Sequence, residues 1–177
     1  MLFRSSYLAA TPQLSYRRLL EALAVLGWRV HAWSYVPGFD HQSQATEAWR
    51  VFRAVREQEG WNAARPHQPR SRGGLTQLRL GHSLGCKLHL LAPDAGRQAH
   101  GLVALAFNNF SAERSVPFLA DIGQQLGFRS EFSPSPAETL RIVRQTWRQP
   151  RNLLVRFRRD ELDQSVRLLE SLRQRPD

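Results

Sequence analysis

The stretch Leu75-Thr-Gln-Leu-Arg-Leu-Gly-His-Ser-Leu-Gly85 decides the expected fold of this chain. Residues 75–80 have the length and apolar content of a short strand, and a helix is expected to leave the motif and run through Leu91. Between them stands Gly81-His82-Ser83-Leu84-Gly85, which has the form Gly-x-Ser-x-Gly. This pattern between a strand and a helix is typical of a nucleophile elbow, a sharp turn that pushes a serine hydroxyl into the open.

Each position of the motif has a steric or electrostatic reason. Gly81 and Gly85 are small enough for the strand and the helix to pass close together, and Ser83 must accept a strained backbone at the turn. The N–H of Leu84 would lie at a helix N-terminus, where partial positive charge can stabilise an oxyanion. His82 is interpreted as a packing residue. The sequence therefore predicts an elbow and oxyanion site made of Gly81, His82, Leu84 and Gly85 around Ser83.

Helices and strands are expected to alternate on both sides of this motif. That alternation predicts an α/β fold with a mostly parallel sheet and helices on both faces. The expected elements outside the motif are, in chain order, a helix over 12–26, a strand over 28–36, a helix over 42–58, a loop over 59–74, a strand over 101–107, helices near 116–126 and 137–148, a strand over 152–157 and a helix over 161–173 with Leu162, Val166, Leu169 and Leu172 facing inward.

Length and composition indicate one globular unit. A chain of 177 residues with 42% hydrophobic residues is long enough for a core, so residues 1–177 are predicted to form a single domain with a helical insertion over about 108–150. Cys86 is the single cysteine, which excludes an internal disulfide, and no run of apolar residues approaches membrane-spanning length. A cytoplasmic protein is expected. No zinc-ligand spacing or phosphate-binding glycine loop is present, so no metal or cofactor is predicted.

The formal net charge of +10 is carried almost entirely by arginine. A solvated surface is the preferred interpretation, and an anionic partner is the alternative. No nucleic-acid-binding motif accompanies the charge, so nucleic acid is not favoured. The densest group of arginines comprises Arg141, Arg144, Arg148, Arg151, Arg156, Arg158 and Arg159.

A serine nucleophile needs a base, and the base needs an orienting acid. Loops that follow parallel strands gather at one edge of a sheet, so residues after each predicted strand are candidates. Asp160 or Asp163 would be the acid. His41 is a candidate base at that edge, although a residue that caps or tethers a loop is the simpler interpretation of it. The residues expected to line the cleft are Asp40, Asn108 and Asn109.

Several segments together resemble the Domain of Unknown Function 1350 family, α/β-hydrolase-like proteins of cyanobacteria and chloroplasts. The resemblance implies an α/β-hydrolase fold with Ser83 as nucleophile, and it implies no particular substrate. The segments that carry it are Ala10-Thr-Pro-Gln-Leu-Ser-Tyr-Arg-Arg-Leu-Leu20, Phe39-Asp-His41, Gly81-His-Ser-Leu-Gly-Cys-Lys-Leu-His-Leu-Leu91, Phe107-Asn-Asn-Phe110, Arg114-Ser-Val-Pro-Phe118, Asn152-Leu-Leu-Val-Arg-Phe157 and Asp160-Glu-Leu-Asp-Gln-Ser165.

Two departures from the family pattern bear on the expected chemistry. Family members usually begin with a strand and a glycine-rich turn, which supplies a second oxyanion donor, whereas this place holds only Met1 to Ala9, without glycine. Members also continue to a late histidine, whereas the last histidine here is His100, which precedes a predicted strand. The chain therefore resembles a short or truncated version of the fold.

Three functions follow as expectations. The first is a serine hydrolase acting on an ester or lipid-like substrate through Ser83. The second is a non-catalytic α/β-hydrolase-like domain that binds a small molecule or partner in the same cleft. The third is binding of an anionic surface by the arginine-rich region, which should weaken with salt. Oligomeric state is left open.

Overall fold

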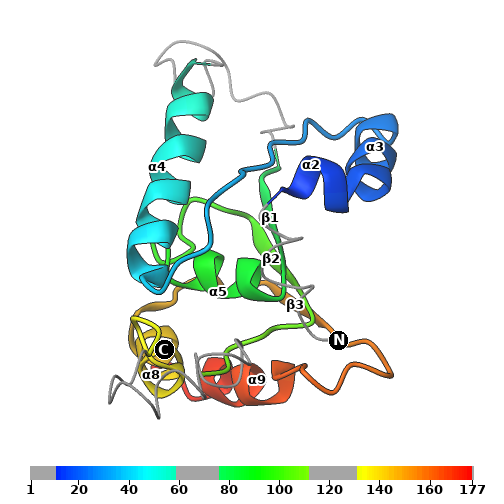
Figure 1. Cartoon of the computed structure of the whole chain (residues 1–177). Coiled ribbons are helices and arrows are strands. Elements are labelled where there is room, and N and C mark those ends of the chain that lie inside the picture. The colour runs from blue at the N-terminus through cyan, green and yellow to red at the C-terminus, as the bar shows by residue number, and fades with distance from the viewer. Residues whose placement is uncertain (1–10, 59–75, 112–130, 177) are drawn as a thin grey trace, which may run out of the picture.

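The computed structural model describes residues 11–58, 76–111 and 131–176 and contains a three-stranded parallel sheet (Figure 1). The strands are β1 (Leu78–His82), β2 (Gly101–Leu105) and β3 (Asn152–Val155), in the spatial order β1-β2-β3. Val103 is in register with Leu80 on one side and with Leu153 on the other. The prediction of an α/β fold with a parallel sheet is confirmed, with each strand within three residues of its expected ends.

Six helices occur in the described parts of the chain: α2 (Pro12–Ser15), α3 (Arg17–Val25), α4 (His41–Gln58), α5 (Leu84–Leu90), α8 (Pro136–Thr146) and α9 (Ser165–Arg173). The predicted helix over 12–26 is divided at Tyr16. Helix α8 begins with a capping box, in which the Ser135 side chain accepts from the Glu138 N–H and the Glu138 carboxylate accepts from the Ser135 N–H. The helix expected near 116–126 and the loop over 59–74 lie outside the described residues.

The strand predicted over 28–36 is wrong, because these residues have no strand pairing. Trp33 and Tyr35 stack with ring centroids 5.1 Å apart and pack against a cluster of Ala45, Leu88 and Leu91. The aromatic residues that indicated a strand therefore cover α4 and α5 instead. Strand propensity reflects packing on a pleated surface as much as backbone preference, and it does not supply a neighbouring strand.

The main core lies on one face of the sheet, between the strands and helices α5, α8 and α9. Leu102 and Ala104 of β2 are completely or almost completely buried there, as are Val143 of α8 and Leu168 of α9. Trp147 is the largest fully buried side chain, and its indole Nε1 donates to Asn152 Oδ1 at 3.0 Å. Helix α4 packs outside α5 and does not touch the strands extensively.

The opposite face of the sheet carries exposed leucines, which corrects the expectation of helices on both faces for the part of the chain that is described. Leu78, Leu80 and Leu153 are 44%, 37% and 57% exposed. They alternate along their strands with residues of the buried face, as pleating requires. Whether a second face of the sheet is covered depends on which helices pack against it. The hydrophobic periodicity of one segment does not specify where that segment packs.

Helix α9 starts four residues later than predicted and faces the core with other residues. Of the residues expected to point inward, Leu172 is buried in the core, whereas Val166 and Leu169 are 47% and 38% exposed. Ser165 and Leu168 are buried as well. The Ser165 hydroxyl accepts a hydrogen bond from the Phe107 N–H at 3.4 Å. This bond ties the helix start to the end of β2 and sets which face of the helix is buried.

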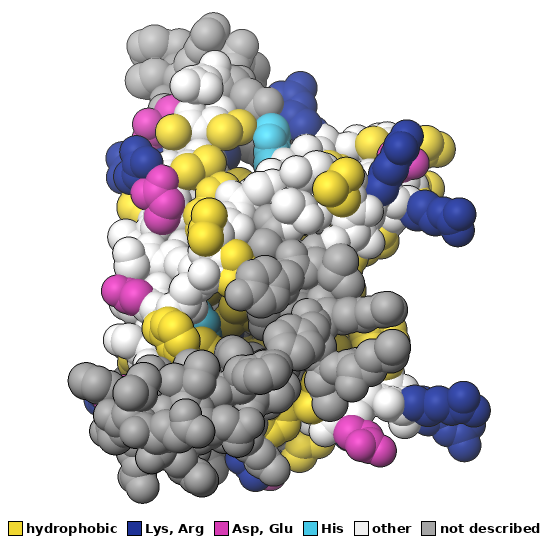
Figure 2. Space-filling view, viewed as in Figure 1, with side chains coloured by type: hydrophobic (Ala, Val, Ile, Leu, Met, Phe, Trp, Pro, Cys, Tyr) yellow, Lys and Arg dark blue, Asp and Glu magenta, His cyan; other side chains and the backbone are white. Residues whose placement is uncertain are grey.

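Charged side chains are spread over the surface. Figure 2 shows arginine side chains at several separated places on the visible face rather than in one patch. None of the helices in the described ranges combines the length and hydropathy needed to cross a membrane.

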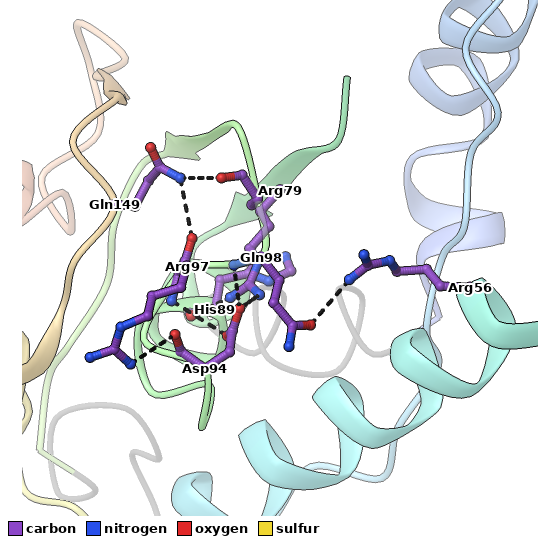
Figure 3. Close-up of polar contacts among 9 residues, drawn as sticks. Arg56, Arg79, His89, Asp94, Arg97, Gln98 and Gln149 are labelled. Atoms are coloured by element: carbon purple, nitrogen blue, oxygen red, sulfur yellow. Dashed lines mark hydrogen bonds and ion pairs between the residues drawn. The ribbon is translucent and has the colours of Figure 1, made fainter. Parts of the chain in front are cut away.

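The amino ends of the strands are held by a buried ion pair. Arg79 Nη2 lies 2.6 Å from Asp94 Oδ2, and the two side chains are 8% and 4% exposed. The carboxylate of Asp94 also accepts from the N–H groups of Gly96 and Gln98, and Gln149 Nε2 donates to the Gly96 carbonyl (Figure 3). These contacts join the segments that precede β2 and β3.

Candidate functional site

Ser83 forms the sharp turn between β1 and α5. Its backbone has φ 54° and ψ −121°, a left-handed conformation that residues other than glycine rarely adopt. The Ser83 N–H donates to the Leu105 carbonyl at 2.9 Å, which attaches the turn to the end of β2. A non-glycine residue in such a conformation costs about 1–3 kcal/mol and persists only where the surroundings impose it. The predicted strand–turn–helix arrangement is therefore present, with its strain at Ser83.

The two glycines of the motif have different roles. A Cβ atom on Gly81 would lie 2.7 Å from both the N and the Cα atom of Cys86, so only glycine fits where the strand and the helix cross. A Cβ on Gly85 would meet no atom within 4 Å. Both glycines were expected to permit the close approach of the strand and the helix. This expectation is correct for Gly81 and wrong for Gly85, because β1 and α5 come into close contact only at Gly81.

The Ser83 side chain is less open than an elbow serine was expected to be. Ser83 is 6% exposed. The backbone N–H of Leu84 occupies the first position of α5, where no carbonyl within the helix can reach it. The Ser83 hydroxyl and the first N–H of α5 thus lie at the same turn.

The two predicted acids lie on the segment between β3 and α9, in different surroundings. Asp163 has a side chain that is 0% exposed, with its Oδ1 accepting from the Ser165 N–H at 2.6 Å and its Oδ2 buried without a partner. Arg156 Nε is 3.7 Å from Asp163 Oδ1. Asp160 uses its Oδ1 to accept from the Leu162 N–H and remains partly exposed.

Hydrogen bonds bring the Asp163 segment to the end of β2, beside the Ser83 turn. Gln164 N–H donates to the Phe107 carbonyl at 2.7 Å, and the thiol of Cys86 lies 3.4 Å from the Leu105 carbonyl. Burial raises the pKa of Cys86 to about 12, and the negative charge of Asp163 contributes to the same shift. The loops after β1, β2 and β3 therefore meet at one edge, as the parallel arrangement predicts.

The two predicted cleft asparagines also lie at this edge. Asn109 is 4% exposed, accepts nothing at its buried Oδ1, and donates from Nδ2 to the Pro136 carbonyl at 2.8 Å. Asn108 Oδ1 accepts from the Phe110 N–H within its own turn. Ala106, just before them, has φ 47°, so a second strained residue lies close to Ser83.

Asp40 and His41 lie at the start of α4, and the strand expected to precede them does not form. Asp40 Oδ1 caps the helix by accepting from the Ser43 N–H at 2.8 Å. His41 is 2% exposed, its ring lies 4.2 Å from that of Phe132, and its Nδ1 has no partner. Among the described residues, no hydrogen bond or ring contact joins His41 to Ser83, and its role as a base stays a prediction.

Lys87 is a buried cation that the sequence did not single out. It lies one helical turn after Ser83, is 1% exposed, and donates from Nζ to the Pro134 carbonyl at 2.9 Å. Burial lowers the pKa of Lys87 to about 8, and burial together with the charge of Lys87 lowers the pKa of His41 to about 4. The sequence feature that could have identified Lys87 is that it is the single lysine in an arginine-rich chain.

Tyr16 is a second residue that sequence reasoning missed. Its hydroxyl is 2.6 Å from His82 Nδ1, and the two rings meet edge to face. Burial lowers the pKa of His82, while the charge of Asp160 acts in the opposite direction. His82 therefore interacts electrostatically with the carboxylate of Asp160. In addition to packing, it contacts the hydroxyl of Tyr16, the residue between α2 and α3.

The described residues contain no group of three or more His, Cys, Asp or Glu side chains that could hold a metal ion. A shallow polar pocket lies at the start of α4, lined by Asp40, Gln42, Ser43, Thr46, Glu47 and Ser133. It includes none of the residues at the Ser83 turn.

Residues 2–177 match the family described as Protein of unknown function (DUF1350), and the chain belongs to that family. No curated protein and no solved structure matches it. The family assignment agrees with the resemblance carried by the motifs, and it brings no reaction or substrate with it.

Proposed function

We propose that the chain is an α/β-hydrolase-type serine hydrolase in which Ser83 attacks an ester or lipid-like acyl group. The observation that carries the proposal is the left-handed backbone of Ser83 between a parallel strand and a helix, with Gly81 against the Cys86 backbone. Strained residues held in this way cluster at functional sites. A turn with only a structural role could use glycine at position 83 without strain.

The neighbouring groups support a division of roles. The Leu84 N–H at the start of α5 would donate to the oxyanion. Asp163 is the preferred acid, because its buried Oδ2 lacks a partner and a histidine N–H would supply one. Asp160 is the alternative, since its charge already acts on His82.

The base would be one of two histidines. His41 is buried with a free Nδ1 and a pKa of about 4, so it is neutral at pH 7 and able to accept a proton. His82 is adjacent to Ser83 in the chain and electrostatically coupled to Asp160. Because its Nδ1 already contacts the Tyr16 hydroxyl, His82 would have to use Nε2.

The test is covalent labelling with a small alkyl fluorophosphonate, located by mass spectrometry. Labelling is expected at Ser83, absent in Ser83→Ala, and unchanged in the control Ser43→Ala, which removes an exposed hydroxyl at the start of α4. His41→Ala and His82→Ala identify the base as the variant in which labelling slows. Folded wild-type protein that remains unlabelled would contradict the proposal.

A non-catalytic binding domain is the second candidate. The observation that favours it is that Ser83 is only 6% exposed. Under this alternative Ser83→Ala changes neither labelling nor any acyl hydrolysis. Ester turnover that disappears in Ser83→Ala would exclude it.

A further inference from the structure

We propose that residues 11–28, here called the amphipathic arm, form a docking surface for an anionic lipid bilayer. The arm contains α2, α3 and Trp28, and it is independent of any chemistry at Ser83. Helix α3 has no buried residue and makes its main contacts with α2. Figure 1 shows α2 and α3 to one side of the sheet, apart from α4, α5, α8 and α9.

The apolar side chains of the arm are covered only in part by the rest of the chain, which leaves Leu20 and Leu23 half-buried. On a helical projection Leu19, Leu20 and Leu23 fall on one side of α3, and Arg17, Arg18 and Glu21 fall on the other. Leu19 is 40% exposed, and the residues around α3 extend the apolar surface: Leu14 is 74%, Leu26 75% and Trp28 40% exposed. Such a face in water is unfavourable unless a partner covers it.

The charge of the arm indicates which partner fits. Within the arm Arg17 and Arg18 outnumber Glu21, which forms an ion pair with Arg17 at 2.7 Å, and the whole chain carries +10. Figure 2 shows arginine and hydrophobic side chains next to one another over α3. A short helix with leucines on one face, arginines on the other and a neighbouring tryptophan matches the pattern of helices that lie in the plane of a bilayer surface. Charge complementarity therefore favours anionic headgroups over a neutral surface.

The arm is attached directly to the Ser83 turn. The Tyr16 hydroxyl between α2 and α3 is 2.6 Å from Nδ1 of His82, the residue before Ser83. A bilayer bound by the arm would consequently lie beside the carboxyl edge of the sheet. This arrangement would present membrane-embedded molecules to that edge, whatever reaction or binding occurs there.

The experiment measures binding of the full chain to vesicles by sedimentation. We expect binding to vesicles of phosphatidylcholine and phosphatidylglycerol in equal parts, weaker binding to pure phosphatidylcholine, and a decrease with added salt. Leu19→Asp should weaken binding by about tenfold or more, because a carboxylate replaces a buried leucine in the bound state. Leu169→Asp is the matched control, since Leu169 on α9 is a leucine of similar exposure, at 38%.

A charge-matched pair separates the arm from the arginine-rich region. Arg17→Gln with Arg18→Gln should weaken binding, whereas Arg158→Gln with Arg159→Gln, which removes the same charge, should leave most of it. Equal losses in the two pairs would overturn the assignment to the arm. Ser83→Ala should bind as the wild type does, so failure of the proposed reaction and failure of docking are distinguishable.

Three further results would also overturn the proposal. The first is wild-type protein that does not bind the anionic vesicles. The second is a much larger loss of thermal stability in lipid-free Leu19→Asp than in Leu169→Asp, because it would mean that the apolar face is already covered within the chain. The third is a dimer in solution that Leu19→Asp dissociates, which would assign the face to a second copy.

Discussion

Buried polar groups have partners at the amino end of the parallel sheet, whereas some of them lack partners at its carboxyl end. At the amino end Arg79 and Asp94 form a short ion pair, and Asp94 accepts further backbone hydrogen bonds (Figure 3). At the carboxyl end Asp163 Oδ2 and Asn109 Oδ1 are buried without partners, and Ser83 has a strained backbone. Unpaired buried groups and strain both cost stability, so their presence together beside Ser83 points to a use other than stability.

The largest effect is expected at the amino end. Asp94→Ala should lower the free energy of unfolding by about 3–5 kcal/mol, because it leaves the buried Arg79 guanidinium without its partner. Urea denaturation measures the change. The matched control is Glu47→Ala, which breaks the exposed pair of Arg50 and Glu47 at 2.6 Å and should change stability little. Similar losses in both variants would mean that the Arg79–Asp94 pair does not hold this end.

A pH-dependent loss of comparable size is expected from His41 at the start of α4. Its folded pKa of about 4 lies below the usual 6.5, so the unfolded chain binds more protons between these values. Stability is therefore fully present above pH 6.5 and is lost as the pH falls towards 4, by on the order of 3 kcal/mol.

His41→Phe should remove this part of the acid dependence while preserving the ring contact with Phe132. His89 has a pKa lowered to about 4 by burial and the charge of Arg79, so a residual slope should remain. Denaturation curves at several pH values test both statements. If the stability of His41→Phe depended on pH as steeply as that of the wild type, His41 would have an ordinary pKa in the folded protein.

Gly81→Ala tests the close crossing at the Ser83 turn. The new Cβ would overlap the Cys86 backbone, and such overpacking costs about 1–3 kcal/mol or more. Gly85→Ala is the matched control: its Cβ meets open space inside α5, where alanine should be neutral or stabilise by about 0.5–1 kcal/mol. Thermal unfolding of the two variants gives the comparison, and equal melting temperatures would exclude the crossing at Gly81.

The smallest effect is a gain of stability at the strained serine. Ser83→Gly should stabilise the fold by about 1 kcal/mol, because glycine adopts a left-handed backbone without the steric penalty. Ser83→Ala keeps the penalty and should not show this gain. Loss of fluorophosphonate labelling in the more stable Ser83→Gly variant would connect the strain to the proposed function. A destabilised Ser83→Gly would argue that the conformation is not strained.

Local patterns were sufficient for some elements and insufficient for others. The three strands, α4, α5 and the turn at Ser83 lie close to their predicted positions, because apolar runs, glycines and caps act within a few residues. The strand over 28–36 was wrong, and the inward face of α9 was right for Leu172 but wrong for Val166 and Leu169. Trp33 and Tyr35 pack against α4 and α5, and Ser165 bonds to Phe107, so distant contacts decided both.

The candidate site shows the same division. Ser83, Gly81 and the acids after β3 were predicted from a motif and from the rule that loops after parallel strands share an edge. Lys87, buried against Pro134, and Tyr16, bonded to His82, were not predicted, because their partners are far away in sequence. His41 was placed at the edge on the basis of a strand that does not form.

By itself the sequence determined the parallel α/β class, the tight turn at Ser83 and the family, since these depend on short-range sterics, on hydrophobic periodicity and on motifs in order along the chain. The tertiary structure alone decided which face of the sheet is covered, which polar atoms find partners and where the amphipathic arm lies. The physical reason is that burial and hydrogen bonding are satisfied between segments distant in sequence, so one segment cannot specify which groups it will meet.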